Sequence, residues 1–407
     1  MGDESIPASG AHLAQGAADF GWDGNKLEPG IGIALSGGGF RAMLFHAGAF
    51  ARLNELGILF RTKRISSVSG GSIAAGHLAA SWDKLGKPDA GGAFANFKVT
   101  VVDPLLAFSR QKIDIVDALT GLLPWTSAAE QVAESYEEHL FGTRTLQDLP
   151  DAPRFVFCAT NLQTGVLWRF SKPYAGDYVV GRLDKPTIKL SHAVAASSAF
   201  PPVLSPFLLK LPSGSFTNWP SVSGVATADL DAFRSRVVLS DGGVYDNHGV
   251  EPIIKRYLTV FVSDGGAPFG RISALETDWI SQLRRILDVT DNQVRALRRR
   301  DLVARLIEGN KIADESKLTG GYTRMGAYWG IDTDPRKINP PNALPCDSTV
   351  THQLARIGTR LSDLGEQTSK QIVNWGYVAC DRGVRANYTG PIGSAKPQLP
   401  FPEASIA

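Results

Sequence analysis

Ser69 stands in a short segment whose residue types suit a catalytic nucleophile. The segment Ser67-Val68-Ser69-Gly70-Gly71 follows a stretch with the pattern of a strand and precedes one with the pattern of a helix. A serine on such a sharp turn presents its hydroxyl clear of the backbone, and small neighbours avoid clashes there. The segment matches the nucleophile-elbow pattern Gly-x-Ser-x-Gly, except that Ser67 replaces the first glycine. It indicates acyl transfer through a covalent intermediate, although a plain glycine turn is the alternative interpretation.

A second candidate segment is the glycine loop Gly37-Gly38-Gly39-Phe40-Arg41, which also lies between a predicted strand and a predicted helix. Unhindered N–H groups at such a place can point at an anion. In acyl transfer that anion is the tetrahedral oxyanion, and one donor is typically worth about 10²–10³ in rate. With Ala42 the loop also satisfies a dinucleotide-binding fingerprint, so an NADP-binding oxidoreductase is a second hypothesis. The next strand lacks the ribose-binding acid of such proteins and leads into the serine turn instead.

A nucleophilic serine needs a base, and the sequence offers three candidates. Asp241 follows a predicted strand and begins the segment Asp241-Gly242-Gly243, while Asp264 begins a second Asp-Gly-Gly. Asp264 leads into Ala-Pro, which is typical of an ordinary turn. His248 is the histidine that could complete a triad. A carboxylate, whose ordinary pKa is about 3.9, gains base strength when it is partly buried beside the serine.

The elements predicted around these segments are typical of an α/β fold. A strand at 31–35, a helix ending near Gly57, a strand at 64–68 and a helix at 73–82 form a β-α-β-α unit. Such a unit favours a mostly parallel sheet with helices on its faces. Further strands are predicted at 154–159, 166–170, 236–239 and 258–262.

Several longer segments are predicted between and after these strands. Residues 99–140 have a helical pattern, within which 113–123 could be a surface helix or a lid, and 212–229 are expected to form an inserted loop. A long basic helix is predicted over 279–312. Its arginines are expected to form a solvated helix face or to contact anionic lipid: Arg295, Arg298, Arg299, Arg300 and Arg305.

Composition excludes several classes of protein. The 407 residues are 43% hydrophobic and 20% charged, which is typical of a globular protein, and 42 Lys and Arg against 40 Asp and Glu argue against a nucleic-acid partner. The spacing of Cys158, Cys346 and Cys380 predicts neither a disulfide framework nor a zinc site, and no other metal or cofactor is expected. No signal peptide or membrane-spanning stretch is visible, so we expect a cytoplasmic protein that meets lipid peripherally.

Five segments together resemble the patatin-like phospholipases, over about residues 30–266 and in the order of that family. They are Gly-Gly-Gly-Phe-Arg-Ala at 37–42, Ser-Val-Ser-Gly-Gly at 67–71, Ala-Thr-Asn-Leu at 159–162, Ala-Ala-Ser-Ser-Ala-Phe-Pro-Pro at 195–202, and Asp-Gly-Gly at 241–243 with Asp-Asn at 246–247. The resemblance implies a three-layer α/β/α sandwich with a mostly parallel central sheet. It also implies a catalytic Ser–Asp dyad of Ser69 and Asp241, without a cofactor.

The same resemblance assigns roles to the surrounding residues. The loop Gly37, Gly38, Gly39, Phe40 and Arg41 would form the oxyanion hole, with Arg41 shaping the loop or facing a phosphate. Supporting positions of the two catalytic motifs would be Ser67, Gly71, Gly242 and Gly243. Three residues depart from the family's usual pattern: Ser67 replaces a glycine, Ser36 replaces an aspartate and His248 replaces an apolar residue. None of these changes removes a catalytic group.

The sequence therefore predicts a lipid acyl hydrolase that cleaves carboxylic esters of phospholipids or lysophospholipids. We expect a flexible leader at 1–27, a catalytic domain at 28–386 and a C-terminal tail at 387–407. A catalytically silent lipid-binding protein of the same fold is a third hypothesis, because fold does not fix function. Head group, acyl chain, activating partner and oligomeric state are not indicated.

Overall fold

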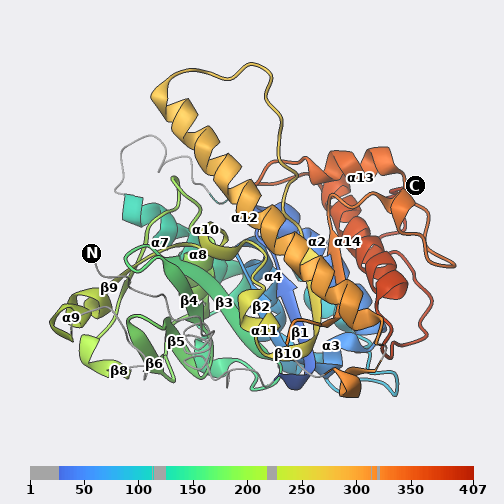
Figure 1. Cartoon of the computed structure of the whole chain (residues 1–407), viewed down its shortest axis with the longest axis horizontal. Helices are drawn as coiled ribbons and strands as arrows, with labels where there is room; N and C mark the ends of the chain where they lie inside the picture. The colour runs from blue at the N-terminus through green and yellow to red at the C-terminus, as the bar shows by residue number, and fades with distance from the viewer. Residues whose placement is uncertain (1–26, 112, 114–124, 218–226, 313, 319–320) are drawn as a thin grey trace, which may run out of the picture.

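A sheet of eleven strands runs through the computed structural model, which describes residues 27–111, 113, 125–217, 227–312, 314–318 and 321–407 (Figure 1). Its main path has the order β11-β10-β1-β2-β3-β4-β5-β6-β8, and β9 and β7 extend from β3. The strands are β1 (Glu28–Leu35), β2 (Thr62–Ser67), β3 (Arg154–Asn161), β4 (Val166–Phe170), β5 (Tyr174–Asp177), β6 (Gly181–Asp184), β7 (Phe207–Lys210), β8 (Phe216–Thr217), β9 (Arg236–Asp241), β10 (Tyr257–Asp264) and β11 (Met325–Gly330).

The two halves of the sheet differ in direction. From β11 to β3 every pairing is parallel, whereas the strands from β4 to β8, and β9 with β7, pair antiparallel. Helices cover both faces of the parallel strands, and all eight residues of the central strand β10 are buried. The carboxyl ends of these parallel strands therefore lie along one edge, where a site can form.

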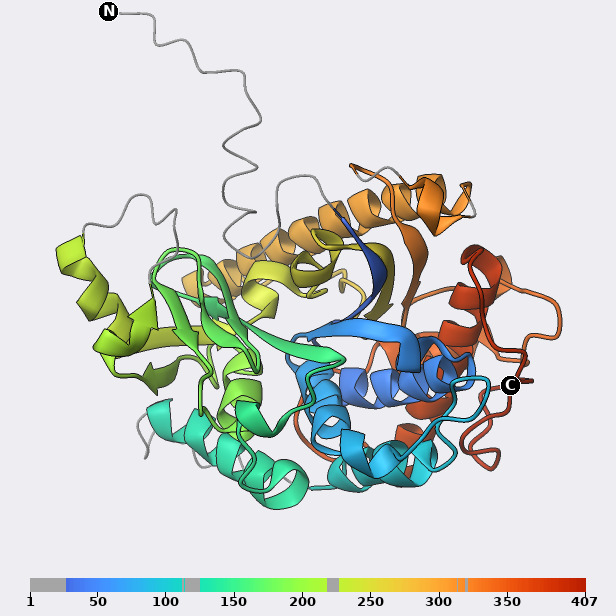
Figure 2. The same ribbon diagram turned by 90° about the horizontal axis from the view of Figure 1, so that it is seen from below.

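Helices cover the sheet on both sides, as Figure 2 shows. On one side lie α2 (Gly39–Glu55), α4 (Gly70–Ala80), α5 (Asp103–Phe108), α7 (Trp125–Tyr136), α8 (Leu190–Ser197) and α14 (Glu366–Asn387). The other side carries the long helix α12 (Trp279–Asn310) and the short α10 (Gly243–Asp246) and α11 (Glu251–Ile254). Leu302 and Leu306 of α12 pack there on Ala34 and Val260 of the sheet. The predicted three-layer α/β/α sandwich is confirmed.

The remaining helices lie around these layers: α3 (Ile58–Arg61), α9 (Thr227–Ser235) and α13 (Ser348–Ala355). All predicted strands are present, with ends shifted by a few residues, and Gly57 ends the helix region of α2 with a left-handed φ of 65°. The helical region predicted over 99–140 contains α5, α7 and two π-helical turns. The surface helix or lid predicted over 113–123 lies outside the described residues except for Ile113, as does most of the loop predicted over 212–229.

The predicted C-terminal tail packs against the body of the protein. Residues 388–407 form no helix or strand, yet Phe401, Ala404 and Ile406 are buried. The Asn374 side chain of α14 donates hydrogen bonds to the carbonyls of Phe401 and Ala404, at 2.7 and 2.8 Å. Of the predicted leader, only Leu27 belongs to the described residues, and it is buried.

Candidate active site

Ser69 lies on a tight turn that joins β2 to α4, as the sequence predicted. It precedes the first residue of α4, and its φ of 51° and ψ of −120° are unusual for a residue with a side chain. Such a conformation costs about 1–3 kcal/mol and persists only where the surroundings enforce it. A side chain at Gly70 would collide with the carbonyl oxygen of Gly39, and one at Gly71 would lie 2.7 Å from that of Leu35. The two glycines therefore allow the turn to sit close against the glycine loop.

A network of buried hydroxyl groups fixes this turn. The Ser69 N–H donates to Ser197 Oγ at 3.1 Å, and Ser197 Oγ donates to the Cys158 carbonyl of β3 at 2.6 Å. Ser72 Oγ lies 2.8 Å from Ser197 Oγ and donates to Ser67 Oγ at 2.9 Å. Ser67 thus has a hydrogen-bonding partner where the family usually has glycine. The positioning roles of Ser72 and Ser197 were not predicted from the sequence, although Ser197 belongs to the family-like segment at 195–202.

The topology of β3 brings Asp241 to Ser69. One edge of β3 pairs with β2 along residues 154–157 and then with β9 along residues 159–161. Because β2 runs parallel and β9 antiparallel to β3, their carboxyl ends point toward each other. Ser67 pairs with Phe157 and Asp241 pairs with Ala159, only two positions farther along. The nucleophile turn and the aspartate therefore meet over the middle of β3.

Asp241 is a buried carboxylate that faces the serine. It is 4% exposed and accepts a hydrogen bond from the Gly243 N–H at 2.7 Å. Burial raises its pKa to about 6, against the opposing effects of hydrogen bonds from the Gly243 N–H and the Ser69 hydroxyl. A side chain at Gly242 would collide with the Cys158 carbonyl, so both glycines of this motif allow the close approach.

Asp264, the alternative base, has other partners. Its Oδ2 accepts hydrogen bonds from His248 Nε2 at 3.0 Å and from the Tyr328 hydroxyl at 2.8 Å, and its Oδ1 lies 3.8 Å from Arg295 Nη2. Burial opposes ionisation of this carboxyl, but His248 and Arg295 outweigh it and hold the pKa of Asp264 well below its usual range. The structure thus pairs His248 with the second aspartate.

The other histidines do not complete a triad either. His46 lies buried between the Ser263 hydroxyl and the Ser36 carbonyl, each at 2.9 Å, and burial lowers its pKa to about 4. His77 lies 3.1 Å from the Thr100 carbonyl, and burial lowers its pKa to about 4 as well. Among the described residues, no histidine forms a hydrogen bond with Ser69.

The glycine loop provides fewer free donors than the sequence suggested. The Gly37 N–H donates to the Asn247 carbonyl at 3.1 Å, and the Phe40 N–H donates to the Arg360 carbonyl at 3.0 Å. These two groups are therefore not available to an oxyanion, which corrects the expectation for Gly37 and Phe40. The N–H groups of Gly38 and Gly39 donate to no atom in the described part of the chain. Their φ values of 141° and 61° are ones that only glycine adopts readily.

Arg41 shapes the loop, which was one of its two expected roles. Its Nε donates to the Gly265 carbonyl at 3.1 Å, and its guanidinium also bonds the Ile357 carbonyl and, at 3.4 Å, Thr359 Oγ1. The side chain is 1% exposed. It connects the glycine loop to two segments that are remote in sequence, and no part of it is left for a phosphate.

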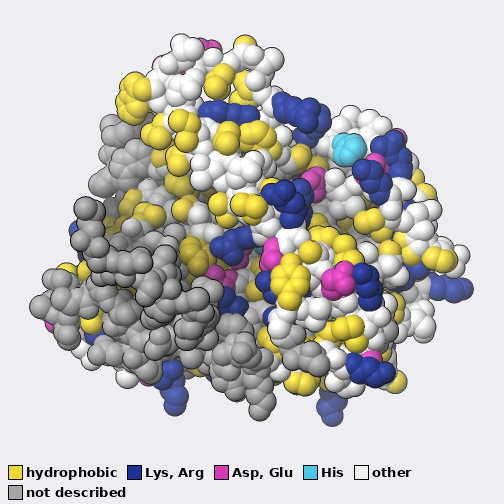
Figure 3. Space-filling view, in the orientation of Figure 1, with side chains coloured by type: hydrophobic (Ala, Val, Ile, Leu, Met, Phe, Trp, Pro, Cys, Tyr) yellow, Lys and Arg dark blue, Asp and Glu magenta, His cyan; other side chains and the backbone are white. Residues whose placement is uncertain are grey.

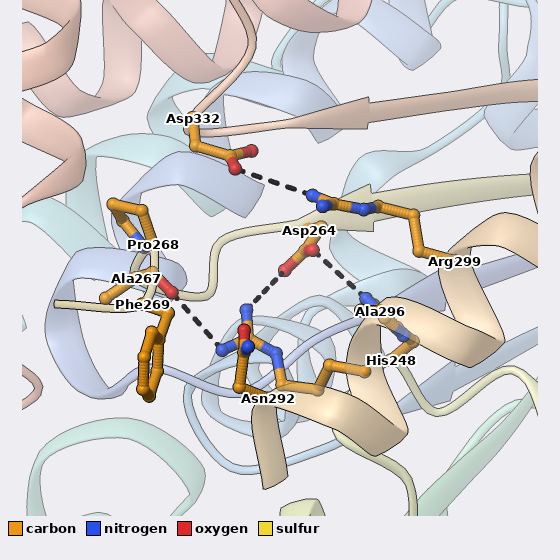
Figure 4. A pocket seen from close by; sticks show the side chains of 10 residues that line it. His248, Asp264, Ala267, Pro268, Phe269, Asn292, Ala296, Arg299 and Asp332 are labelled. Carbon is orange, nitrogen blue, oxygen red and sulfur yellow. Dashed lines mark hydrogen bonds and ion pairs between the residues drawn. The ribbon is translucent and has the colours of Figure 1, made fainter. Parts of the chain in front are cut away.

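A cavity of about 190 Å³ lies beside Asp264. Its lining includes His248, Asn292 and Asp332 together with Pro268 and Phe269, and Figure 4 shows His248 joined to Asp264 and Arg299 joined to Asp332. Arg295 and Arg299 of α12, which also line it, form ion pairs with Asp264 and Asp332. Within the described residues, no His, Cys, Asp or Glu side chains group closely enough to hold a metal ion.

Comparison with known protein families gives a match over more than half of the chain. The sequence model of the family described as patatin-like phospholipase matches residues 33–254. No curated protein sequence matches the chain. None of the helices in the described ranges combines the length and the apolar character needed to cross a membrane.

Solved structures that resemble the chain include human GIVD cytosolic phospholipase A2, with 16% identity, a TM-score of 0.38 and coverage of 63% of this chain and 46% of that one. The same human enzyme in complex with methyl gamma-linolenyl fluorophosphonate has 12% identity, a TM-score of 0.49 and coverage of 91% and 60%. VipD from Legionella pneumophila has 14% identity, a TM-score of 0.35 and coverage of 88% and 68%. The matched part is thus less than half of the first of these chains.

Proposed function

Because this chain belongs to the patatin-like phospholipase family, we propose that it hydrolyses carboxylic esters of lipids, with Ser69 as the nucleophile and Asp241 as the base. Residues 28–386 would form its catalytic domain. The observation that carries the proposal is a buried carboxylate at Asp241, with a pKa of about 6, that lies near enough to the Ser69 hydroxyl for that hydroxyl to affect its pKa. An ordinary surface aspartate would be too weak a base for this task, and burial corrects that weakness.

The proposed reaction has two halves. Asp241 takes the proton of Ser69 Oγ as that oxygen attacks the ester carbonyl, and the N–H groups of Gly38 and Gly39 donate to the resulting oxyanion. The intermediate expels the alcohol, which leaves with the proton from Asp241, and an acyl-enzyme remains. Water then attacks the acyl group and gives a proton to Asp241. Collapse of the second intermediate returns that proton to Ser69 Oγ and releases the fatty acid.

The raised pKa of Asp241 suits both halves of this cycle. At neutral pH a carboxyl with a pKa of about 6 is mostly ionised, so it can accept a proton, and it is also acidic enough to return one. The Gly243 N–H holds the carboxylate in place without a histidine. His248, engaged by Asp264, would have a structural role.

The geometry of the glycine loop argues against the NADP-binding alternative. A pyrophosphate would need several free N–H groups at this loop and an open approach to them. Gly37 and Phe40 already donate within the chain, and a side-chain carbon on Gly39 would lie 2.5 Å from the Arg360 carbonyl oxygen. The loop is therefore covered by chain at a position where a dinucleotide would have to lie.

Labelling with a fluorophosphonate tests the proposal directly. We expect the wild-type protein to be labelled on Ser69 and the Ser69→Ala variant to be unlabelled. Ser66→Ala is the matched control, because Ser66 is also buried and lies on the strand that leads to the turn, and this variant should retain labelling. A folded wild-type protein that resists labelling would overturn the hydrolase proposal and favour a silent lipid-binding protein. If Ser69 is labelled, comparing the rates of fatty-acid release from phosphatidylcholine and from lysophosphatidylcholine identifies the preferred substrate.

A further inference from the structure

The outward side of α12 is apolar, which is unusual for a helix at the surface of a protein. In Figure 1 the N-terminal half of α12 extends beyond the body of the molecule, and in Figure 3 hydrophobic side chains gather over this region. Their exposures are between 37% and 75%, and at 100° per residue they lie mainly on one side of the helix. We call this surface the α12 apolar face: Trp279, Ile280, Leu283, Ile286, Leu287, Val294 and Leu297.

The opposite side of α12 faces the protein through its arginines. Arg295 lies 3.8 Å from Asp264, Arg298 lies 3.7 Å from Asp246, and Arg299 lies 3.4 Å from Asp332. These three arginines were expected to form a solvated face or to contact lipid; instead each pairs with an acid on a neighbouring element, while the side chains of Arg298 and Arg299 stay 34% and 42% exposed. The helix is therefore amphipathic in the reverse sense, with ion pairs toward the body and large apolar side chains toward the outside.

The segment that precedes α12 continues the apolar surface. Phe269, Ile272 and Leu275 are 37%, 54% and 40% exposed. Arg285 of the helix bonds the Gly270 carbonyl at 2.9 Å and stacks on the Phe269 ring, so this segment is tied to the same end of the helix. Phe269 and Trp279 suit the boundary between water and lipid, since both rings can be buried among acyl chains and the Trp279 indole N–H can stay in the polar layer.

Positive charge surrounds the α12 apolar face. Residues 267–300 contain seven arginines and four acids. Arg271, Arg284 and Arg300 are exposed and form no ion pair with any described residue. The four acids Glu276, Asp278, Asp288 and Asp291 are exposed as well, so the excess of positive charge is modest. Apolar contact would thus provide most of the binding, and the arginines would complement anionic head groups.

The position of α12 links this face to the candidate active site. Arg298 pairs with Asp246 and donates to the Tyr245 carbonyl at 3.4 Å, and both residues belong to α10, which directly follows Asp241 and Gly242. Asp291 of α12 lies near enough to Asp241 to raise the pKa of its carboxyl further. A surface bound by α12 is therefore held close to the strand end that carries the proposed base.

We propose that the α12 apolar face docks on the surface of a phospholipid bilayer and holds the active site at the lipid from which it takes its substrate. The purpose of this docking rests on the proposed function, whereas the binding of vesicles can be tested without any hydrolysis. A projecting helix with bulky side chains fits a fluid, penetrable surface, whereas a partner protein would need a groove to receive it. The modest excess of arginine near the face favours a bilayer that contains anionic lipid.

Flotation with phospholipid vesicles tests the docking surface. We expect the full chain, carrying Ser69→Ala to prevent turnover, to float with phosphatidylcholine vesicles and more strongly when phosphatidylserine is added. Changing Leu283, Ile286 and Leu287 together to serine should lower the partition coefficient about 100-fold or more, because three half-exposed apolar side chains are lost. The matched control changes Phe60, Val99 and Ile392 to serine, since these side chains are similarly exposed on other elements, and it should bind as before.

Three results would overturn the docking proposal. The α12 triple variant could bind vesicles as well as the parent, or the control triple could lose binding equally. Alternatively, sedimentation velocity without lipid could show a dimer that only the α12 triple variant loses, which would assign the face to a second copy of the chain. Arg284→Glu with Arg300→Glu should remove the enhancement by phosphatidylserine and leave binding to phosphatidylcholine.

Hydrolysis assays separate this proposal from the proposed function. With Ser69 restored, the α12 triple variant should hydrolyse a water-soluble ester at the wild-type rate and vesicle lipid at least about tenfold more slowly. If no ester is hydrolysed but vesicles are still bound through α12, the proposed function fails and the docking surface stands. If esters are hydrolysed but vesicle binding does not depend on α12, the docking proposal fails and the proposed function stands.

Discussion

Replacing Asp241 by asparagine should abolish hydrolysis and at the same time make the folded protein more stable at neutral and alkaline pH. Burial raises the pKa of this carboxyl from 3.8 to about 6. A difference of this size corresponds to about 3 kcal/mol. Asparagine has the same shape and keeps an oxygen that can accept the Gly243 N–H, but it carries no charge that must be buried. The variant should therefore gain up to about 3 kcal/mol in the free energy of unfolding.

The direction in which the stability difference changes with pH follows from the raised pKa of Asp241. The folded chain binds a proton at Asp241 more tightly than the unfolded chain does, so ionisation of this group opposes folding. That penalty is fully present above pH values of about 6 and disappears below about 3.8. The stability advantage of Asp241→Asn over the wild type should therefore be largest near pH 8 and fall toward zero near pH 3.5, values chosen to lie roughly outside this window.

Urea denaturation of both proteins across this pH range provides the measurement, with ester hydrolysis assayed on the same samples. Asp264→Asn is the control, because the pKa of Asp264 is held well below its usual range. Its ionisation favours folding at any pH above the unfolded value, so this variant should lose about 3 kcal/mol at neutral pH. An Asp241→Asn variant that is less stable than wild type at pH values near 8, or whose advantage does not change with pH, would refute the reasoning.

Three further predictions concern the turn, the loop and the pH profile. Ser69→Gly should be inactive yet about 1 kcal/mol more stable than Ser69→Ala, since glycine relieves the positive φ; equal stability in denaturation curves would contradict the strain. Gly39→Ala should lose at least about 2 kcal/mol and most activity, because a Cβ there meets the Arg360 carbonyl at 2.5 Å; an active, stable variant would disprove this packing. Hydrolysis of a soluble ester should rise as pH increases through about 6, following ionisation of Asp241, and keep this profile in His248→Gln; a profile shifted by the histidine change would implicate His248.

The sequence located Ser69 because everything that defines its turn is local. A strand, a serine between small residues and a helix follow one another within a few positions, and the structure shows this arrangement. Asp241 was harder to separate from Asp264, because each follows a strand and begins Asp-Gly-Gly. The difference lies in strand order: β9 joins the edge of β3 that β2 also uses, whereas β10 lies on the far side of β1. Local sequence does not encode that order.

Two expectations failed because their outcome depends on remote segments. Gly37 and Phe40 have the right type and spacing for oxyanion donors, but their N–H groups are taken by the carbonyls of Asn247 and Arg360. The sequence also did not predict which face of α12 packs on the sheet, because periodicity distinguishes two faces of a helix but does not determine which of them is buried. Acids that lie across from the arginines, such as Asp246 and Asp332, decided it.

Because β2 and β9 pair with the same edge of β3, the protein is suited to being split into two fragments that reassemble. Ser69 and Asp241 come from opposite ends of a long stretch of chain, and the pairing of Ser67 with Phe157 and of Asp241 with Ala159 brings their two strand ends together. A cut between β8 and β9 would leave the serine and β3 in one fragment and the aspartate in the other. Neither fragment alone would contain both residues of the proposed dyad. Esterase activity would then report the reassembly of β9 onto β3.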